Sequence, residues 1–83
     1  MELTCRQIVR SNSGRDKNTF LVIVKTDKEY VFICDGKERP LERPKRKNIK
    51  HICPTKLCLS EKQMATNREL RRTIRELAPK SGA

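Results

Sequence analysis

The chain has 83 residues, of which 35% are hydrophobic, and it carries a formal net charge of +10. This length allows one small domain with a compact core, because a domain of this size buries only about 60% of its unfolded surface. No uninterrupted apolar run exceeds five residues, whereas a membrane-spanning helix needs about 20. The sequence therefore excludes a transmembrane helix, and the polar N-terminal stretch leads us to expect a cytoplasmic protein.

Basic residues are distributed unevenly along the chain. The net charge is +1 over residues 1–36, +6 over residues 37–60 and +3 over residues 61–83. Solubility alone needs a net charge of only about 2–8 in magnitude for a small domain. Clustered lysines and arginines in such an excess therefore predict a polyanion partner, such as a nucleic acid.

Short strands and turns are expected over the first two thirds of the chain. The segment 19–25 is apolar on both faces, which is typical of a strand buried on both sides. Pro40 restricts the segment 37–42 to a sheet edge, and Pro54 is expected to end the last strand. The basic stretch 43–48 is expected to be a loop. Strands are predicted over residues 7–11, 19–25, 29–34, 37–42 and 49–53. Several short strands separated by tight turns predict a mainly β fold, a small barrel.

The last third of the chain changes to a helical period. Leu70, Ile74 and Leu77 recur at intervals that place them on one helix face. Thr66 followed by Glu69 fits a capping box, in which the hydroxyl binds one free amide and the carboxylate reaches back. Four arginines are expected on the opposite side of the helix: Arg68, Arg71, Arg72 and Arg75. They form either a solvated outer face or a second nucleic-acid surface.

These elements imply one β domain followed by a helix. The sequence is divided into a barrel at 1–58, a linker at 59–66, an amphipathic helix at 67–78 and a flexible tail at 79–83. Pro79 and Gly82 are expected to end the helix.

The loop between the first two predicted strands is the first candidate binding element. Gly14 permits a tight turn and close approach to another molecule. Arg15 can fork onto a phosphate, Lys17 can supply a point charge, and Ser13 adds a neutral donor. The alternative is an ordinary surface loop.

The basic run at 37–50 is the second candidate binding element. It holds seven basic and two acidic residues, and Pro40 and Pro44 keep its backbone extended. Each phosphate that it neutralises would release condensed counterions. The alternative is an incidental, disordered basic loop. Its candidate phosphate-binding residues are Arg43, Lys45, Arg46, Lys47 and Lys50.

The order and spacing of several short motifs resemble a known family. They are Gln-Ile-Val at 7–9, Ser-Gly-Arg-Asp-Lys at 13–17, the apolar strand at 20–24, Tyr-Val-Phe-Ile-Cys-Asp-Gly at 30–36, Arg-Pro-Lys-Arg-Lys at 43–47 and Lys-His-Ile at 50–52. Residues 3–55 resemble small bacterial KOW-domain RNA-binding proteins, which are grouped with archaeal and eukaryotic large-subunit ribosomal proteins. Arg6 and Asn18 stand where such proteins often have glycine.

The resemblance implies an SH3-like β-barrel of the KOW type that binds structured RNA, with ribosomal RNA as the leading candidate. In such a barrel, the loop after the first strand and a loop near the last strand can lie at the same end. We therefore expect the two basic elements to form one continuous phosphate-binding face.

The four cysteines and the single histidine lack the paired spacing of a zinc site. Cys53 and Cys58 are separated by four residues, while Cys5 and Cys34 stand alone in the sequence. Reduced thiols, no bound metal and no cofactor are therefore expected. His51 and Cys53 have no third member to activate them, and the chain has no Gly-rich phosphate loop, so we expect no enzyme activity.

The favoured function is a monomeric, ribosome-associated module that docks on RNA through backbone phosphates, with ribosomal or translation-factor proteins as further partners. Phe20 and Phe32 are expected in the core and Tyr30 at a strand start, so recognition should not depend on base stacking. One alternative is a protein-interaction adaptor of the translation or transcription machinery, docked through the apolar helix stripe. DNA binding is a weaker alternative, because phosphate contacts alone do not separate the two nucleic acids.

Overall fold

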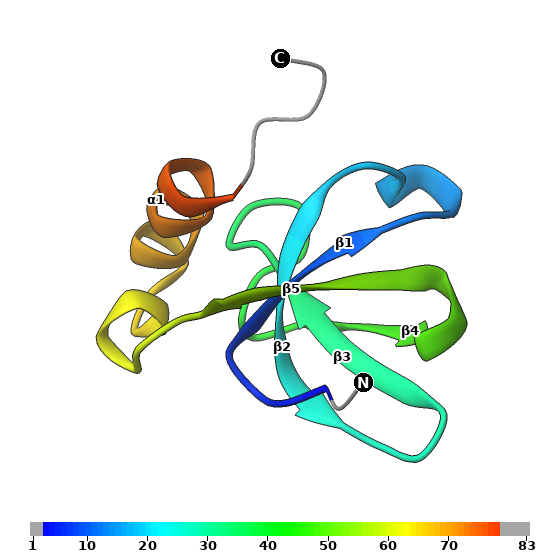
Figure 1. Cartoon of the computed structure of the whole chain (residues 1–83). Coiled ribbons are helices and arrows are strands. Elements are labelled where there is room, and N and C mark those ends of the chain that lie inside the picture. Colours follow the sequence, from blue (N-terminus) through cyan, green and yellow to red (C-terminus); the bar gives the residue numbers. More distant parts are fainter. Residues whose placement is uncertain (1–2, 79–83) are drawn as a thin grey trace.

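A computed structural model describes residues 3–78, which form a mainly β domain with one C-terminal helix (Figure 1). One-turn 3₁₀ helices occupy Gly14–Asp16, Ile49–His51 and Lys62–Met64, and α1 spans Asn67–Leu77. The strands are β1 (Gln7–Ser11), β2 (Phe20–Thr26), β3 (Tyr30–Cys34), β4 (Lys45–Asn48) and β5 (Ile52–Cys58).

The five strands form one antiparallel sheet in the order β4-β3-β2-β1-β5. The two edge strands, β4 and β5, follow one another in the chain and are connected by the 3₁₀ turn at Ile49–His51. Within the described residues no ladder joins these edges, so the sheet is open and the predicted barrel closure is not seen. The prediction of a mainly β domain with a C-terminal helix is confirmed.

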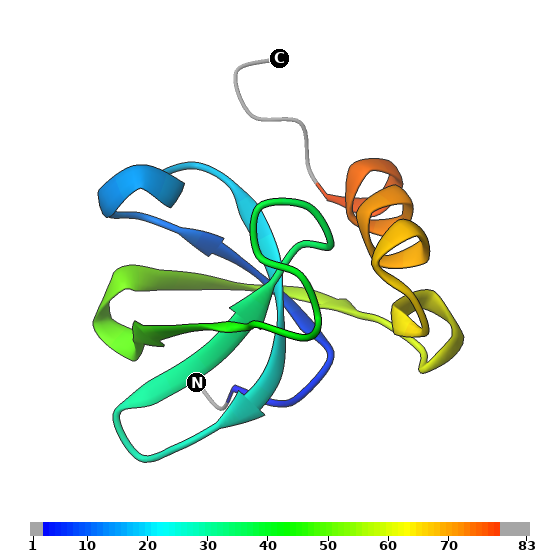
Figure 2. The ribbon, with the colours of Figure 1, turned by 180° about the vertical axis from the view of Figure 1, so that it is seen from behind.

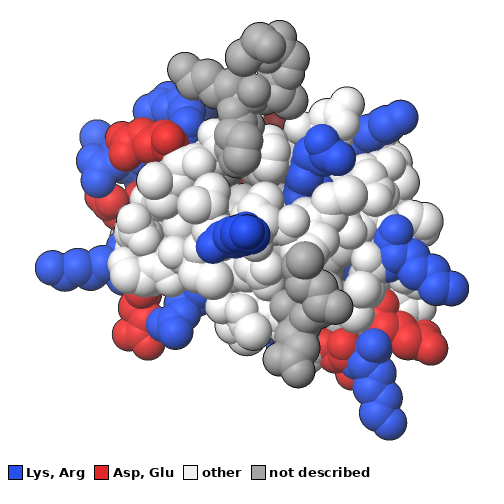
Figure 3. Space-filling view, viewed as in Figure 1, with Lys and Arg blue, Asp and Glu red and all other residues white. Residues whose placement is uncertain are grey.

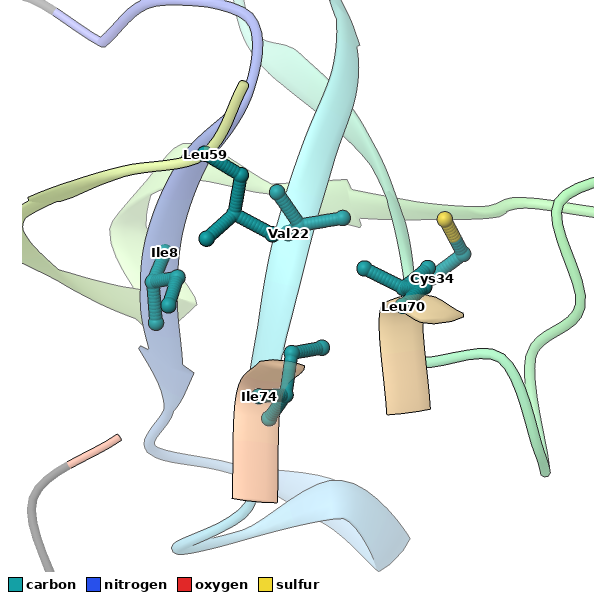
Figure 4. Close-up of a cluster of buried hydrophobic side chains, with 6 residues drawn as sticks. All are labelled: Ile8, Val22, Cys34, Leu59, Leu70 and Ile74. Atoms are coloured by element: carbon teal, nitrogen blue, oxygen red, sulfur yellow. The ribbon is translucent and has the colours of Figure 1, made fainter. Parts of the chain in front are cut away.

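Both faces of the sheet are covered by apolar side chains. On the helix side, Ile8 pairs with Val22 and Val22 pairs with Cys34, which makes a row across three strands. This helix-side cluster comprises Ile8, Val22, Cys34, Leu59, Leu70 and Ile74 (Figure 4). The far-side cluster comprises Val9, Leu21, Ile23, Val31, Ile33 and Ile52. The prediction that the second strand is buried on both sides is therefore confirmed.

Helix α1 begins and packs largely as its sequence predicts. The Thr66 hydroxyl accepts a hydrogen bond from the Glu69 amide at 3.1 Å, which caps the first turn. The Glu69 carboxylate accepts from Arg72 at 2.8 Å, so its described partner is this arginine and not the Thr66 amide. Leu70 and Ile74 are buried against the sheet, whereas Leu77 is 41% exposed. The predicted end of the helix at Pro79 and Gly82 and the tail at 79–83 lie outside the described residues.

The segment that follows β3 is fastened to the start of α1, as Figure 2 shows from behind. Asn67 accepts a hydrogen bond from the Leu41 amide at 2.7 Å and donates to the Glu42 carboxylate at 3.0 Å. Asp35 accepts from the Arg39 amide at 2.9 Å. These contacts occupy backbone amides that a strand would use for its ladder, so the prediction of a strand at 37–42 is wrong.

Long-range pairing corrects two further predictions, one of a loop and one of the end of a strand. The basic stretch predicted as a loop contains β4, which pairs with the free edge of β3 from Ile33↔Lys45 to Tyr30↔Asn48. A lysine-rich strand suits a sheet edge, because its charges discourage pairing with other chains. β5 continues beyond Pro54. An edge strand tolerates a proline because the backbone groups along one of its sides have no hydrogen-bond partner in the sheet.

Leu59 lies 4% exposed in the helix-side cluster, so the segment predicted as a linker contributes to the core at its first residue. In the described part of the chain, no helix has both the length and the apolar character needed to cross a bilayer.

Candidate nucleic-acid interface

The β1–β2 loop is held closed by its own backbone. The Ser11 amide donates to the Thr19 carbonyl at 2.9 Å, and the Asn18 amide donates to the Ser11 carbonyl at 2.7 Å. Gly14 has φ +72 and opens the 3₁₀ turn that carries Arg15. The side chains of Arg15 and Lys17 are exposed at the surface of this turn. The loop therefore presents two cations from a defined backbone.

Strand alternation divides the basic residues of β4 between two faces. Lys45 pairs with Ile33 and Lys47 pairs with Val31, so both lysines share the face of the far-side cluster. Lys47 is only 8% exposed, in keeping with its place on the face of the far-side cluster. Arg46 points to the opposite face. The expectation that Lys45, Arg46 and Lys47 line one track is therefore wrong.

The buried lysine of β4 joins the two predicted binding elements. The Lys47 ammonium donates to the Ser13 carbonyl at 2.9 Å, and it lies 3.5 Å from the point where a Cβ on Gly14 would stand. Nearby, the backbone amide of Asn12 donates to the backbone carbonyl of His51 at 2.9 Å. The β1–β2 loop therefore lies against the end of β4 and the turn that follows it.

The surface around this junction carries exposed cations, with Glu29 near Lys50 and with Asp35 and Glu38 near Arg15. Lys50 is exposed on the turn at Ile49–His51, next to the loop that carries Arg15 and Lys17. None of these three side chains makes an ion pair with a described carboxylate. We call Ser13, Gly14, Arg15, Lys17, Lys47 and Lys50 the loop–turn face. Arg43 is also exposed, but it lies before β4, at the opposite end of that strand.

Charge is gathered at the margins of the molecule in the view of Figure 3. Lysine and arginine side chains project mainly from the periphery, while the middle of that face is mostly uncharged.

The aromatic side chains of β3 form a feature that the sequence did not predict. The Arg46 guanidinium lies 4.6 Å from the centre of the Tyr30 ring, and the Lys25 ammonium lies 5.6 Å from that of Phe32. Phe32 is half-buried on the helix side of the sheet and does not belong to either apolar cluster, so its predicted core position is wrong. Phe20 is half-buried and packs against the helix-side cluster. Alternation along β3 could have separated Phe32 from Val31 and Ile33, because adjacent residues of a strand face opposite sides.

The cysteines occupy contrasting environments. Burial raises the pKa of the Cys34 thiol to about 12, and the carboxylates of Asp35 and Glu42 add to the effect. Hydrogen bonds from Asn12 at 3.4 Å and Arg10 at 3.8 Å lower the pKa of Cys53. Within residues 3–78, no three or more His, Cys, Asp or Glu side chains gather in a metal-binding group. That the purified protein carries no zinc stays a prediction.

No protein-family model matches the chain, and no curated protein matches it significantly.

Proposed function

We propose that this protein is an RNA-binding module that docks on structured RNA, with ribosomal RNA as the leading candidate. The observation that carries the proposal is the pair of hydrogen bonds that joins the β1–β2 loop to the end of β4 and the following turn. Arg15 and Lys17 are exposed on this loop and Lys50 is exposed on this turn, and none of the three makes an ion pair with a described carboxylate. The KOW-like sequence favours RNA over DNA as the nucleic acid.

We also propose the SH3-like barrel of the KOW type as the finer description of the fold. Two edge strands that follow one another through a one-turn 3₁₀ helix are consistent with a strongly curled sheet. The contact between Lys47 and Ser13 supports such curling, because it links β4 to the end of β1, three strand positions away in the sheet.

The proposed chemistry is recognition of backbone phosphates. Arg15 offers a planar fork of donors that matches two phosphate oxygens, and Lys17 and Lys50 offer compact positive charges. Lys47 has a different role in the proposal, since it holds the Ser13 carbonyl and thereby fixes the loop. Binding through these groups should depend on salt and be indifferent to base sequence.

The test compares RNA affinity at several salt concentrations for the wild type and the variant Arg15→Ala/Lys17→Ala, using folded large-subunit ribosomal RNA as the probe. Each lost phosphate contact should reduce the log–log salt slope by about 0.7 to 0.9. The matched control is Lys56→Ala/Lys62→Ala, which removes two exposed cations from β5 and from the turn that follows it. If both variants fold and bind with the wild-type affinity and slope, the loop–turn face is not the RNA site.

A further inference from the structure

The arginines of α1 line a hollow in the surface. Together with Gly36 they surround a volume of about 530 Å³. A second hollow of about 260 Å³ adjoins it and shares Arg71 and Arg75 with the first. Lys37, Phe20 and Ile74 also line the second hollow. We call the combined hollow the helix groove.

The backbone that carries the helix groove is held in place because the start of α1 is locked to the turn after β3. Gly36 has φ +82, and a Cβ at this position would stand 2.3 Å from the backbone oxygen of Asn67. The side chain of Asn67 is itself bonded to the segment beneath the helix. Leu70 and Ile74 are buried in the core. The arginines therefore extend, exposed, from a helix whose backbone is fixed against the turn after β3.

The helix groove carries a large excess of positive charge. Arg72 is neutralised in part by Glu69, whose carboxylate lies 2.8 Å from its guanidinium. Arg68, Arg71 and Arg75 make no ion pair with any described carboxylate. Asp35 is the acidic residue that lines the groove, at the border that it shares with Lys37.

Acidic residues separate the helix groove from the loop–turn face. Between them lies another hollow, of about 350 Å³, in which Arg15 and Arg39 are opposed by Asp35 and Glu38. This strip has as many acids as bases, so it offers little attraction to phosphate. The loop–turn face and the helix groove therefore meet at this charge-balanced hollow, which Arg15 borders from one side and Asp35 from the other.

We propose that the helix groove binds the phosphate backbone of a second segment of the same folded RNA. The inference rests on the proposed function, since it takes the partner to be RNA. Guanidinium groups fork onto phosphate oxygens, and three of them without acidic partners are suited to adjacent phosphates of one strand. A molecule with two such sites clamps two backbone segments that the RNA fold brings together.

The decisive variant is Arg71→Gln/Arg75→Gln, which removes two charges but keeps aliphatic stems and helix-forming residues. With folded large-subunit ribosomal RNA as the probe, the salt slope should fall by about 1.4 to 1.8, which corresponds to a loss of about 25- to 60-fold in affinity at 0.1 M salt. Because the sites are separate, combining this variant with Arg15→Ala/Lys17→Ala should give losses that multiply. The Lys56→Ala/Lys62→Ala variant is again the control, and amide exchange in α1 verifies that the helix stays docked.

The outcomes distinguish this inference from the proposed function. If the groove variant binds like the wild type while the loop variant is weakened, the helix groove is not an RNA site and the loop–turn face stands. If only the groove variant is weakened, the groove stands and the loop–turn face fails. Inorganic phosphate is the second probe. If it saturates the groove at concentrations that leave RNA affinity unchanged, the groove is a small-anion site and the inference fails.

Discussion

Two residues adopt a backbone conformation that glycine would adopt more readily. Arg6 has φ 71 and Asn18 has φ 70, in the left-handed region. The KOW resemblance drawn from the sequence motifs marked these positions as ones where such proteins often have glycine. Arg6 is held there by two backbone bonds, from its amide to the Ile23 carbonyl at 2.6 Å and from the Leu59 amide to its carbonyl at 2.7 Å. These bonds hold Arg6 in the left-handed conformation although it carries a side chain.

Replacing Arg6 by glycine should therefore stabilise the protein. The left-handed conformation costs a side-chain-bearing residue about 1–2 kcal/mol, and glycine loses about 0.5–1 kcal/mol in chain entropy, so the net gain should lie between about 0 and 1.5 kcal/mol. The exposed ion pair of Arg6 with Glu61, at 3.5 Å, adds little to oppose this. Urea denaturation measures the change. The control Arg6→Ala loses the ion pair but keeps the strain, so an equal gain in that variant would contradict the explanation.

The thiols give a second prediction at this scale. Cys34 has a pKa raised above its unfolded value of 9.0 to about 12, so the folded state favours the protonated thiol. Its contribution to stability is complete below pH 9 and should be lost as the pH rises toward 12.

The pKa of Cys53 is lowered, so this thiol should react with iodoacetamide at a lower pH than an ordinary thiol.

Alkylation rates measured across pH on a variant that keeps only Cys53 test the second effect. Asn12→Ala removes the hydrogen bond to its sulfur and should move the midpoint of the profile to higher pH. An unchanged midpoint would show that this hydrogen bond does not set the reactivity.

For Cys34, the unfolding free energies of the wild type and of Cys34→Val should diverge above pH 9. Parallel curves would contradict the raised pKa of the Cys34 thiol.

At the scale of elements, the docking of α1 determines most of what the surface presents. Its buried side chains Leu70 and Ile74 complete the helix-side cluster, and its 11 residues span only about 16 Å of the sheet. Cys34 is therefore covered, whereas Phe32 and Tyr30 remain beyond the helix. The apolar stripe proposed for an adaptor is largely used by the protein's own sheet, with Leu77 as its exposed end.

Gly36→Ala should separate the helix from the sheet. The new Cβ would meet the Asn67 backbone oxygen at 2.3 Å and would also occupy a left-handed conformation, so we expect a loss of at least about 2 kcal/mol. Gly14→Ala is the matched control, because its φ is similar but its nearest neighbour is the flexible end of Lys47 at 3.5 Å. Hydrogen exchange should show unprotected α1 amides in the first variant alone. Equal protection in both would mean that Gly36 does not position the helix.

The whole molecule has an open sheet whose two edges must be protected. β4 carries three basic residues on one edge, and β5 carries Pro54, which lacks a ladder donor, on the other. Repulsion between like-charged edges and the net charge of +10 both oppose association.

We therefore expect a monomer, and sedimentation over a range of protein concentrations measures it. Raising the salt concentration screens the charges and is the harder condition for this prediction. A dimer that forms with rising concentration at moderate salt would show that an edge strand pairs between chains.

The sequence by itself determined the features that depend on near neighbours. The two-sided apolar pattern of residues 20–24 and the helix with its cap at Thr66 follow from side chains only a few positions apart. The excess of positive charge is likewise a property of composition. Such features are local, so they could be predicted before any packing was known.

Only the tertiary structure decided how distant segments meet. A stretch of charged residues became β4 because β3 had a free edge, and the resulting alternation buried Lys47 while it exposed Arg46. The helix groove exists because Gly36 lets the turn after β3 approach Asn67. Strand pairing and helix docking depend on which surfaces remain unpaired elsewhere in the fold, and no local pattern in the sequence carries that information.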